Sequence, residues 1–245
     1  MWPGVLKRAL AVIVSGAVTV TFAACVSTED ESAKIERDAQ VAREHEPGAL
    51  KLGATNPTVR VTDVTLLRGA GRGAVAMKLT SSSTHAQRKV PVLVEVEGGG
   101  GKLLYSNQPG GTDPKLQHVS LLGPHEGVWW VNDQVLVNQP SKGVKVRVGT
   151  GSGGRTPDAV SARKPRLGGE PGANVVDGEL VNEGSRAQHA VPVYAVALRG
   201  GKVVAAGSAL VASLAGHKGA SAGFHIQLVG DASNAKIELS AVPAS

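Results

Sequence analysis

Residues 187–198, AQHAVPVYAVAL, decide the fold, because a related motif occurs earlier as AQRKVPVLVEVE at residues 86–97. Each copy begins with Ala-Gln, continues through Val-Pro-Val and ends in a largely apolar run. Both copies then turn through glycines to a lysine, Lys102 in the first and Lys202 in the second. A second pair of turns, LGPHEG (122–127) and LAGHKG (214–219), follows in the same order. Three blocks in one order indicate an internal duplication.

The segments around these blocks alternate between apolar and polar residues with a period of two. Such alternation places one face of a strand on a core and the other in water. Glycine-rich turns separate the segments, so we predict an all-β fold with two immunoglobulin-like antiparallel sandwich modules in tandem. The clearest alternating segments are 59–64, 144–148, 224–228 and 236–240.

The second copy resembles the FxLYD-type domain of bacterial envelope lipoproteins. The resemblance rests on GELVNEG (178–184), VPVYAVALRGGK (191–202) and SLAGHKGASAGFHIQL (213–228). It covers about residues 173–243, and the first copy resembles the same pattern more weakly. The aromatic-Leu-Tyr-Asp signature itself is replaced by VALR at 196–199. The resemblance implies an immunoglobulin-like sandwich and no catalytic residues.

The chain begins like a secretory signal. Residues 1–8 carry two positive charges and no acid, residues 9–24 carry no charge, and the run ends in Phe22-Ala23-Ala24-Cys25. This end resembles the lipobox of bacterial lipoproteins. The resemblance implies a diacylglycerol thioether on Cys25, cleavage after Ala24, and acyl chains such as palmitate, with or without an N-acyl chain. The protein would then be extracytoplasmic and held to the cell membrane by lipid.

Two other interpretations of this segment remain open. An uncleaved transmembrane anchor would need about 20 apolar residues, and this run is shorter. An ordinary secretory signal would leave the cysteine incidental. Cys25 is the only cysteine, so the chain forms no internal disulfide.

These patterns divide the chain into five parts. Residues 26–51 are densely charged and are expected to form a solvated, partly helical tether. Residues 150–173 are rich in Gly, Pro and basic residues and are expected to form a linker. The predicted parts are the signal peptide (1–24), the lipidated N-terminus and tether (25–52), the first module (53–149), the linker (150–173) and the second module (174–245).

The net charge of +6 is spread along the chain, which does not indicate nucleic-acid binding. No Gly-x-Ser-x-Gly nucleophile motif occurs. The seven histidines show neither H-x-H nor H-E-x-x-H spacing, which are common in metal sites. The glycine runs lack the Gly-Lys-Ser/Thr sequence of a phosphate-binding loop. We therefore predict no enzyme activity, no catalytic residue, no metal and no cofactor beyond the covalent lipid.

The most informative local feature is the sequence VWWVNDQ at 128–134. Neighbouring strand residues face opposite sides, so one tryptophan is expected in the core and the other outside. An outward tryptophan near polar side chains suits a sugar or protein contact. The first copy carries about eight residues more than the second, within SNQPGGTDPKLQHV (106–119). In the other interpretation the outward tryptophan packs on this insertion or on the tether. The candidate contact residues are Trp129, Trp130, Asn132 and Asp133.

The functional hypothesis is a non-enzymatic envelope lipoprotein whose two modules contact an envelope protein or a wall polymer. The alternative is a solute- or metal-binding lipoprotein that serves a transporter. Such binders usually have two larger lobes around a cleft, which this pattern does not indicate. An accessory protein or inhibitor of an enzyme is a third possibility.

Overall fold

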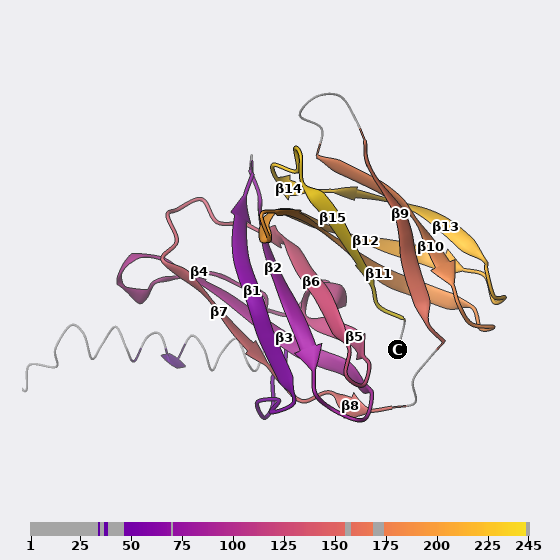
Figure 1. Cartoon of the computed structure of the whole chain (residues 1–245). Coiled ribbons are helices and arrows are strands. Elements are labelled where there is room, and N and C mark those ends of the chain that lie inside the picture. Colours follow the sequence, from indigo (N-terminus) through magenta and orange to yellow (C-terminus); the bar gives the residue numbers. More distant parts are fainter. Residues whose placement is uncertain are drawn as a thin grey trace, which may run out of the picture. The chain divides into compact units, whose positions relative to one another are not determined.

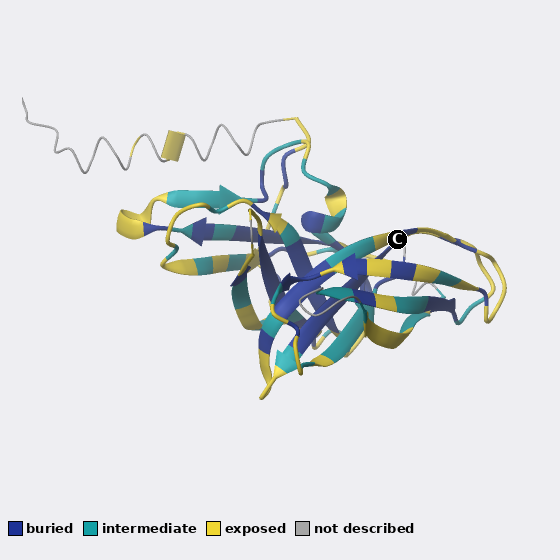
Figure 2. Cartoon of the chain, turned by 90° about the horizontal axis from the view of Figure 1, so that it is seen from above, coloured by how far each residue is buried: buried dark blue, intermediate teal, exposed yellow. Residues whose placement is uncertain are grey.

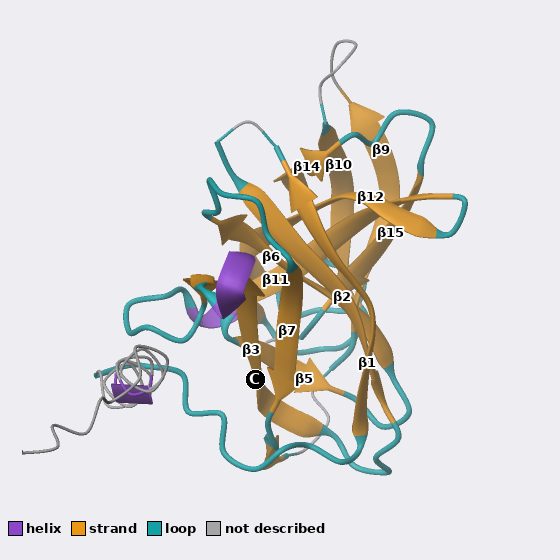
Figure 3. Ribbon diagram, turned by 90° about the vertical axis from the view of Figure 1, so that its left-hand side faces the viewer, coloured by secondary structure: helices purple, strands orange, loops and turns teal. Residues whose placement is uncertain are grey.

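The computed structural model describes residues 34, 37–38, 47–69, 71–154, 158–168 and 174–243. Residues Gln40–Ser245 form one compact unit. Its described part consists of antiparallel strands joined by loops, with two short 3₁₀ turns, Gly99–Gly101 (η1) and Pro114–Leu116 (η2) (Figures 1 and 3). The predicted all-β fold class is confirmed. The predicted signal peptide and most of the tether lie outside the described residues.

The first module has two sheets. One has the strand order β1-β2-β6, and the other is centred on β3, which pairs with four further strands. Buried side chains from both sheets share one core. The strands are β1 (Val59–Arg68), β2 (Gly73–Ser81), β3 (Gln87–Glu97), β4 (Leu103–Ser106), β5 (His118–Leu122), β6 (Gly127–Val135), β7 (Gly143–Val148) and β8 (Ser152–Gly153).

The second module repeats this arrangement with fewer strands. One sheet has the order β13-β10-β9, and the other has the order β14-β12-β11-β15. The strands are β9 (Val160–Gly168), β10 (Val175–Asn182), β11 (Gln188–Arg199), β12 (Lys202–Leu214), β13 (Ser221–Gln227), β14 (Val229–Gly230) and β15 (Lys236–Ala241).

Backbone details support the duplication. Lys89 of β3 and Ala190 of β11 occupy the same motif position, and both have left-handed φ values of 48° and 51°. Asp63 and Lys164, at the same place in β1 and β9, also have left-handed values. Because non-glycine residues rarely adopt this conformation, its recurrence at matched positions indicates that the repeat begins at β1 and β9. The repeat is therefore longer than the sequence blocks alone indicated.

The predicted linker is wrong in its extent. Residues 150–173 contain β8, which pairs with β3, and β9, which pairs with β10. The second module thus begins with β9 rather than at residue 174. β9 lies at the end of its sheet, and Arg163, Lys164 and Arg166 on it are exposed. Proteins commonly place charged side chains on edge strands, because the charges prevent pairing with another chain. Such a strand therefore resembles a linker in composition.

Strand β11 is buried on both faces, which explains its nearly continuous apolar sequence. Val191, Val193 and Ala195 lie in the core of the second module. The alternate residues Tyr194 and Val196 lie in the core that includes the first module. The two modules therefore share apolar packing through the outer face of β11. Figure 2 shows dark-blue buried segments in the middle of the strand assembly.

The end of the predicted tether is packed on the first module. Leu50 is buried, and its N–H donates to the carbonyl of Gln108 at 2.8 Å. A Cβ atom at Gly110 would collide with the Pro47 carbonyl, and one at Gly149 would collide with the Leu52 carbonyl. Glycine at both places permits this close approach. Residues 47–52, which were predicted to belong to the tether, are therefore part of the folded unit.

Candidate functional site

The tryptophan strand β6 is covered on both faces. Trp130 is fully buried in the first module's core. Asn132, two residues further along and also fully buried, points to the same side and donates to the Tyr105 hydroxyl at 2.7 Å. Burial raises the Tyr105 pKa, although this hydrogen bond opposes the rise. This face of β6 is therefore internal, as expected for one of the two tryptophans.

The other face of β6 meets the second module. The Trp129 indole N–H donates to Glu238 Oε2 at 3.1 Å, and its backbone N–H donates to Ser240 Oγ at 3.0 Å. Asp133 Oδ2 accepts the backbone N–H of Ser208 at 2.9 Å. The Lys78 ammonium lies 5.8 Å from the centre of the Trp129 ring. Glu238, Ser240 and Ser208 come from β15 and β12 of the second module.

The proposed external contact by Trp129, Trp130, Asn132 and Asp133 is therefore corrected. Trp129 is only 6% exposed, and the second module covers it rather than the insertion or the tether. In the first copy Trp130 pairs with Met77, and at the matching place in the second copy Phe224 pairs with Gly178. Phe224 is therefore the counterpart of Trp130, and Gly223 is the counterpart of Trp129. Only the first copy has a large side chain at this position, which suits a contact with the other module.

Ionisable groups at this interface respond to their surroundings. Hydrogen bonds from Lys236 and then from Trp129 lower the pKa of Glu238. Burial raises the pKa of Tyr194 far above its usual value, and the charge of Asp133 adds to the rise. The Tyr194 hydroxyl and the Ser208 hydroxyl have no hydrogen-bond partner within the described part of the chain. These groups lie inside the protein and do not form an open site.

An open site lies at another place between the modules. It is a hollow of about 470 Å³, here called the intermodule cleft. The first module contributes polar side chains and the second contributes apolar ones. The residues that line it include Lys89, Lys115, His118, Ala190, Pro192 and Leu210.

The polar wall of the cleft carries a cationic excess. Asp113 accepts the backbone N–H of Lys115 at 3.0 Å and lies 3.6 Å from the Lys115 ammonium. Lys89, by contrast, has no carboxylate partner among the residues that the structure describes. Burial lowers the pKa of His118, the Lys89 charge adds to this effect, and a hydrogen bond to the Pro114 carbonyl opposes it. The His118 imidazole and the Lys89 ammonium both line the cleft.

The apolar wall is formed by neighbouring strands of the second module. Pro192 of β11 lies directly opposite Leu210 of β12. Leu210 is 46% exposed, which makes it one of the four exposed large apolar side chains in the described regions. Ala190, at the left-handed position of β11, completes this side. The cleft thus combines a free cation with exposed apolar surface.

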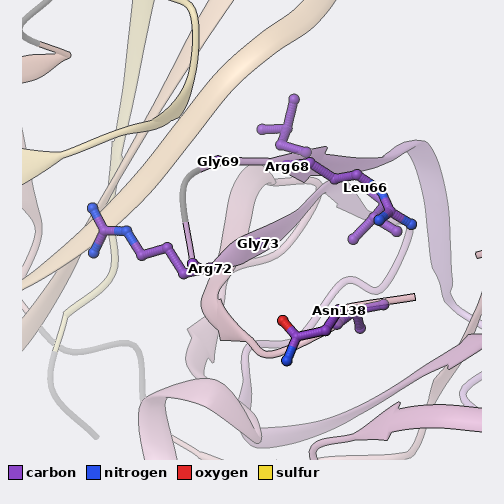
Figure 4. A pocket seen from close by; sticks show the side chains of 9 residues that line it. Leu66, Arg68, Gly69, Arg72, Gly73 and Asn138 are labelled. Carbon is purple, nitrogen blue, oxygen red and sulfur yellow. The ribbon is translucent and has the colours of Figure 1, made fainter. Parts of the chain in front are cut away.

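A second hollow of about 160 Å³ lies at the turn between β1 and β2 (Figure 4). Arg68 in its wall donates to the Gln139 carbonyl and to Ser141 Oγ. Arg72 extends away from Asn138 in the close-up, so the two do not converge on one point. This small hollow offers no group of convergent functional side chains.

The remaining sequence-predicted residues are placed as follows. Cys25, Phe22, Ala23 and Ala24 lie outside the described residues. Within the described ranges, no group of three or more His, Cys, Asp or Glu side chains is arranged to hold a metal ion. In the same ranges, no helix is long and apolar enough to cross a membrane.

Comparison with known proteins gives no relative, since no family model matches the chain and no curated protein matches it significantly.

Sequence reasoning missed the intermodule cleft. Lys89 and Ala190 were visible as matched positions of the repeat, but nothing in the sequence indicated that both lie in one cleft. Lys115 and His118 lie within residues 106–119, where the first copy carries its extra residues, but no sequence pattern singled them out. Their convergence depends on how the two modules pack.

Proposed function

We propose that this protein is a non-enzymatic lipoprotein of the cell envelope, anchored through lipid on Cys25, that presents its β unit to an envelope protein or a wall polymer. The observation that carries the proposal is the order of segments in the sequence. A basic start, an apolar run and Ala-Ala-Cys are followed by a charged spacer and then by a folded all-β unit. This order suits a domain held outside a membrane.

The packing of the two modules supports the presentation part of the proposal. Because the modules share apolar packing, a partner meets one surface rather than two independently moving ones. The positive net charge would favour an anionic partner, such as a wall polymer, through long-range attraction.

The alternative, a solute-binding lipoprotein, is favoured by one observation. The intermodule cleft has a volume within the range of small-molecule sites. For a metal-binding lipoprotein, the described residues contain no cluster of His, Cys, Asp or Glu side chains that could hold the ion.

The anchor is tested with Cys25→Ser in the full chain, with Val26→Ser as the matched control. We expect Cys25→Ser to remain unprocessed or to leave the membrane fraction, because no thiol remains to carry lipid. Val26→Ser should behave like the natural chain. Cell fractionation and the mass of the mature N-terminus are the measurements. Equal processing and equal membrane retention of Cys25→Ser would contradict the anchor.

The same cells test presentation. In cross-linked cells, the natural chain should form adducts with an envelope protein or with wall fragments, and Cys25→Ser should lose most of them. Adducts in neither preparation, with the anchor intact, would reject presentation while leaving the lipoprotein assignment in place.

A further inference from the structure

We propose that the intermodule cleft binds a small amphiphilic monoanion, a carboxylate carried on a short aliphatic chain. This site goes beyond presentation of the modules and does not depend on the anchor at Cys25. The inference rests on the two contrasting walls of the cleft and on the strained backbone that forms part of each wall.

The charge of the polar wall selects an anion. Asp113 neutralises Lys115, which leaves the Lys89 ammonium as the uncompensated charge at the cleft. The Lys89 charge acts on the His118 ring, so the two groups lie within electrostatic reach of each other. Ser120 adds a hydroxyl to the same wall. One carboxylate would pair with Lys89 and accept a hydrogen bond from a neighbouring donor.

The opposite wall selects an apolar body. Leu210 exposes nearly half of its surface beside Pro192, although large apolar side chains are usually buried. A short aliphatic chain lying over this pair would remove apolar surface from water, which is favourable in proportion to the area covered. A bare inorganic anion would leave this wall uncovered, and a neutral hydrocarbon would leave Lys89 unpaired.

The backbone on both sides supports a site. Lys89 and Ala190 line the cleft, and both hold a left-handed conformation that is strained for non-glycine residues. Glycine would relieve the strain but would remove the side chain from the wall. Neither copy has glycine at this position.

The probe is hexanoate, added to the full chain, with 1-hexanol and acetate as comparison ligands. The readout is the NMR signal of the His118 ring, assigned with His118→Gln. We expect a saturable shift with hexanoate and an increase of the His118 pKa on binding, because an added anion favours the protonated ring. Among the described residues, Lys89, Lys115 and Asp113 are the charged groups that line the cleft with His118, whereas β11 and β12 contribute apolar lining. Hexanol and acetate should each bind about tenfold more weakly.

Two variants test the walls separately. Lys89→Gly suits the left-handed backbone and should weaken hexanoate binding about tenfold. Leu210→Ser alters an exposed side chain and should weaken it about threefold. Lys202→Ala, which removes an exposed lysine outside the cleft, should leave binding unchanged. Absence of a saturable shift, equal binding of hexanol, or equal effects of the Lys89 and Lys202 variants would each overturn the proposal.

Discussion

At the scale of single residues, Glu238 connects the two modules chemically. Its carboxylate accepts hydrogen bonds from Lys236 of its own strand and from Trp129 of the first module. Its side chain is 32% exposed, so solvent screens part of this interaction. The lowered pKa means that the ionised form favours the folded state.

This linkage predicts a stability loss in acid. The contribution of Glu238 is complete above its ordinary pKa of 4.5 and disappears as pH falls through the lower value of the folded state. Glu238→Gln keeps an acceptor for Trp129 but cannot titrate. Between about pH 6 and about pH 3, its free energy of unfolding should therefore fall less steeply than that of the natural chain. Urea unfolding followed by circular dichroism measures the slope.

Glu97→Gln provides the control, because Glu97 pairs with Lys145 on the β3-centred sheet, away from the contacts that join the modules. If Glu238→Gln shows the same acid profile as the natural chain, the interface does not depend on that charge.

At the scale of elements, the motif position shared by β3 and β11 departs from ordinary strand geometry. Ala190 has a φ of 51°, and its neighbours His189 and Val191 pair with Ser213 and Val211 of β12. Valine normally stabilises strands, but a β-branched residue is poorly accommodated at positive φ. Local backbone conformation therefore reverses the usual preference at this position.

At residue 190 we predict that glycine makes the protein at least as stable as alanine does, and that valine makes it less stable. Ala190→Val should lower the free energy of unfolding by about 1 kcal/mol or more. Ala190→Gly should change it by less than about 0.5 kcal/mol, because relief of strain offsets the greater freedom of the unfolded chain. Urea midpoints of the three chains provide the comparison. Greater stability of Ala190→Val than of the natural chain would show that the position is an ordinary strand site.

At the scale of the whole molecule, the two modules pack together within one compact unit. Tyr194 and Val196 of the second module lie in the same cluster as Trp129 and Trp130 of the first. Hydrogen bonds from Trp129 and to Asp133 cross the same contact. Separating the modules would expose this apolar surface and leave Asp133 without the Ser208 N–H.

We therefore predict a single unfolding transition for the folded unit. Far-ultraviolet circular dichroism and tryptophan fluorescence should give coincident curves in urea. Leu180→Ala, in the second module's own core, should lower the free energy of unfolding by about 2 to 5 kcal/mol. Both curves should then move together to lower urea concentration. A fluorescence curve that stays in place while the circular dichroism curve splits would mean that the modules unfold independently.

The repeat and the alternating strands were readable from sequence, because local patterning follows from which face of a strand is buried. The strand at 224–228 and the motif at 187–198 illustrate this, since both lie in strands of the second module. β9 was missed because an exposed edge strand needs few apolar residues. Trp129 was correctly assigned to the face opposite Trp130, but its covering was not predictable.

The all-β class and the duplication could be read from the amino-acid sequence, because both follow from patterns within short segments that can be compared directly. The folded structure was needed to find what covers Trp129, that β9 begins the second module, and which side chains form the intermodule cleft. The covering of Trp129 and the cleft depend on residues far apart in the chain, such as Trp129 with Glu238 and Lys89 with Leu210. Packing between the two copies brings these residues together, and no local pattern encodes it.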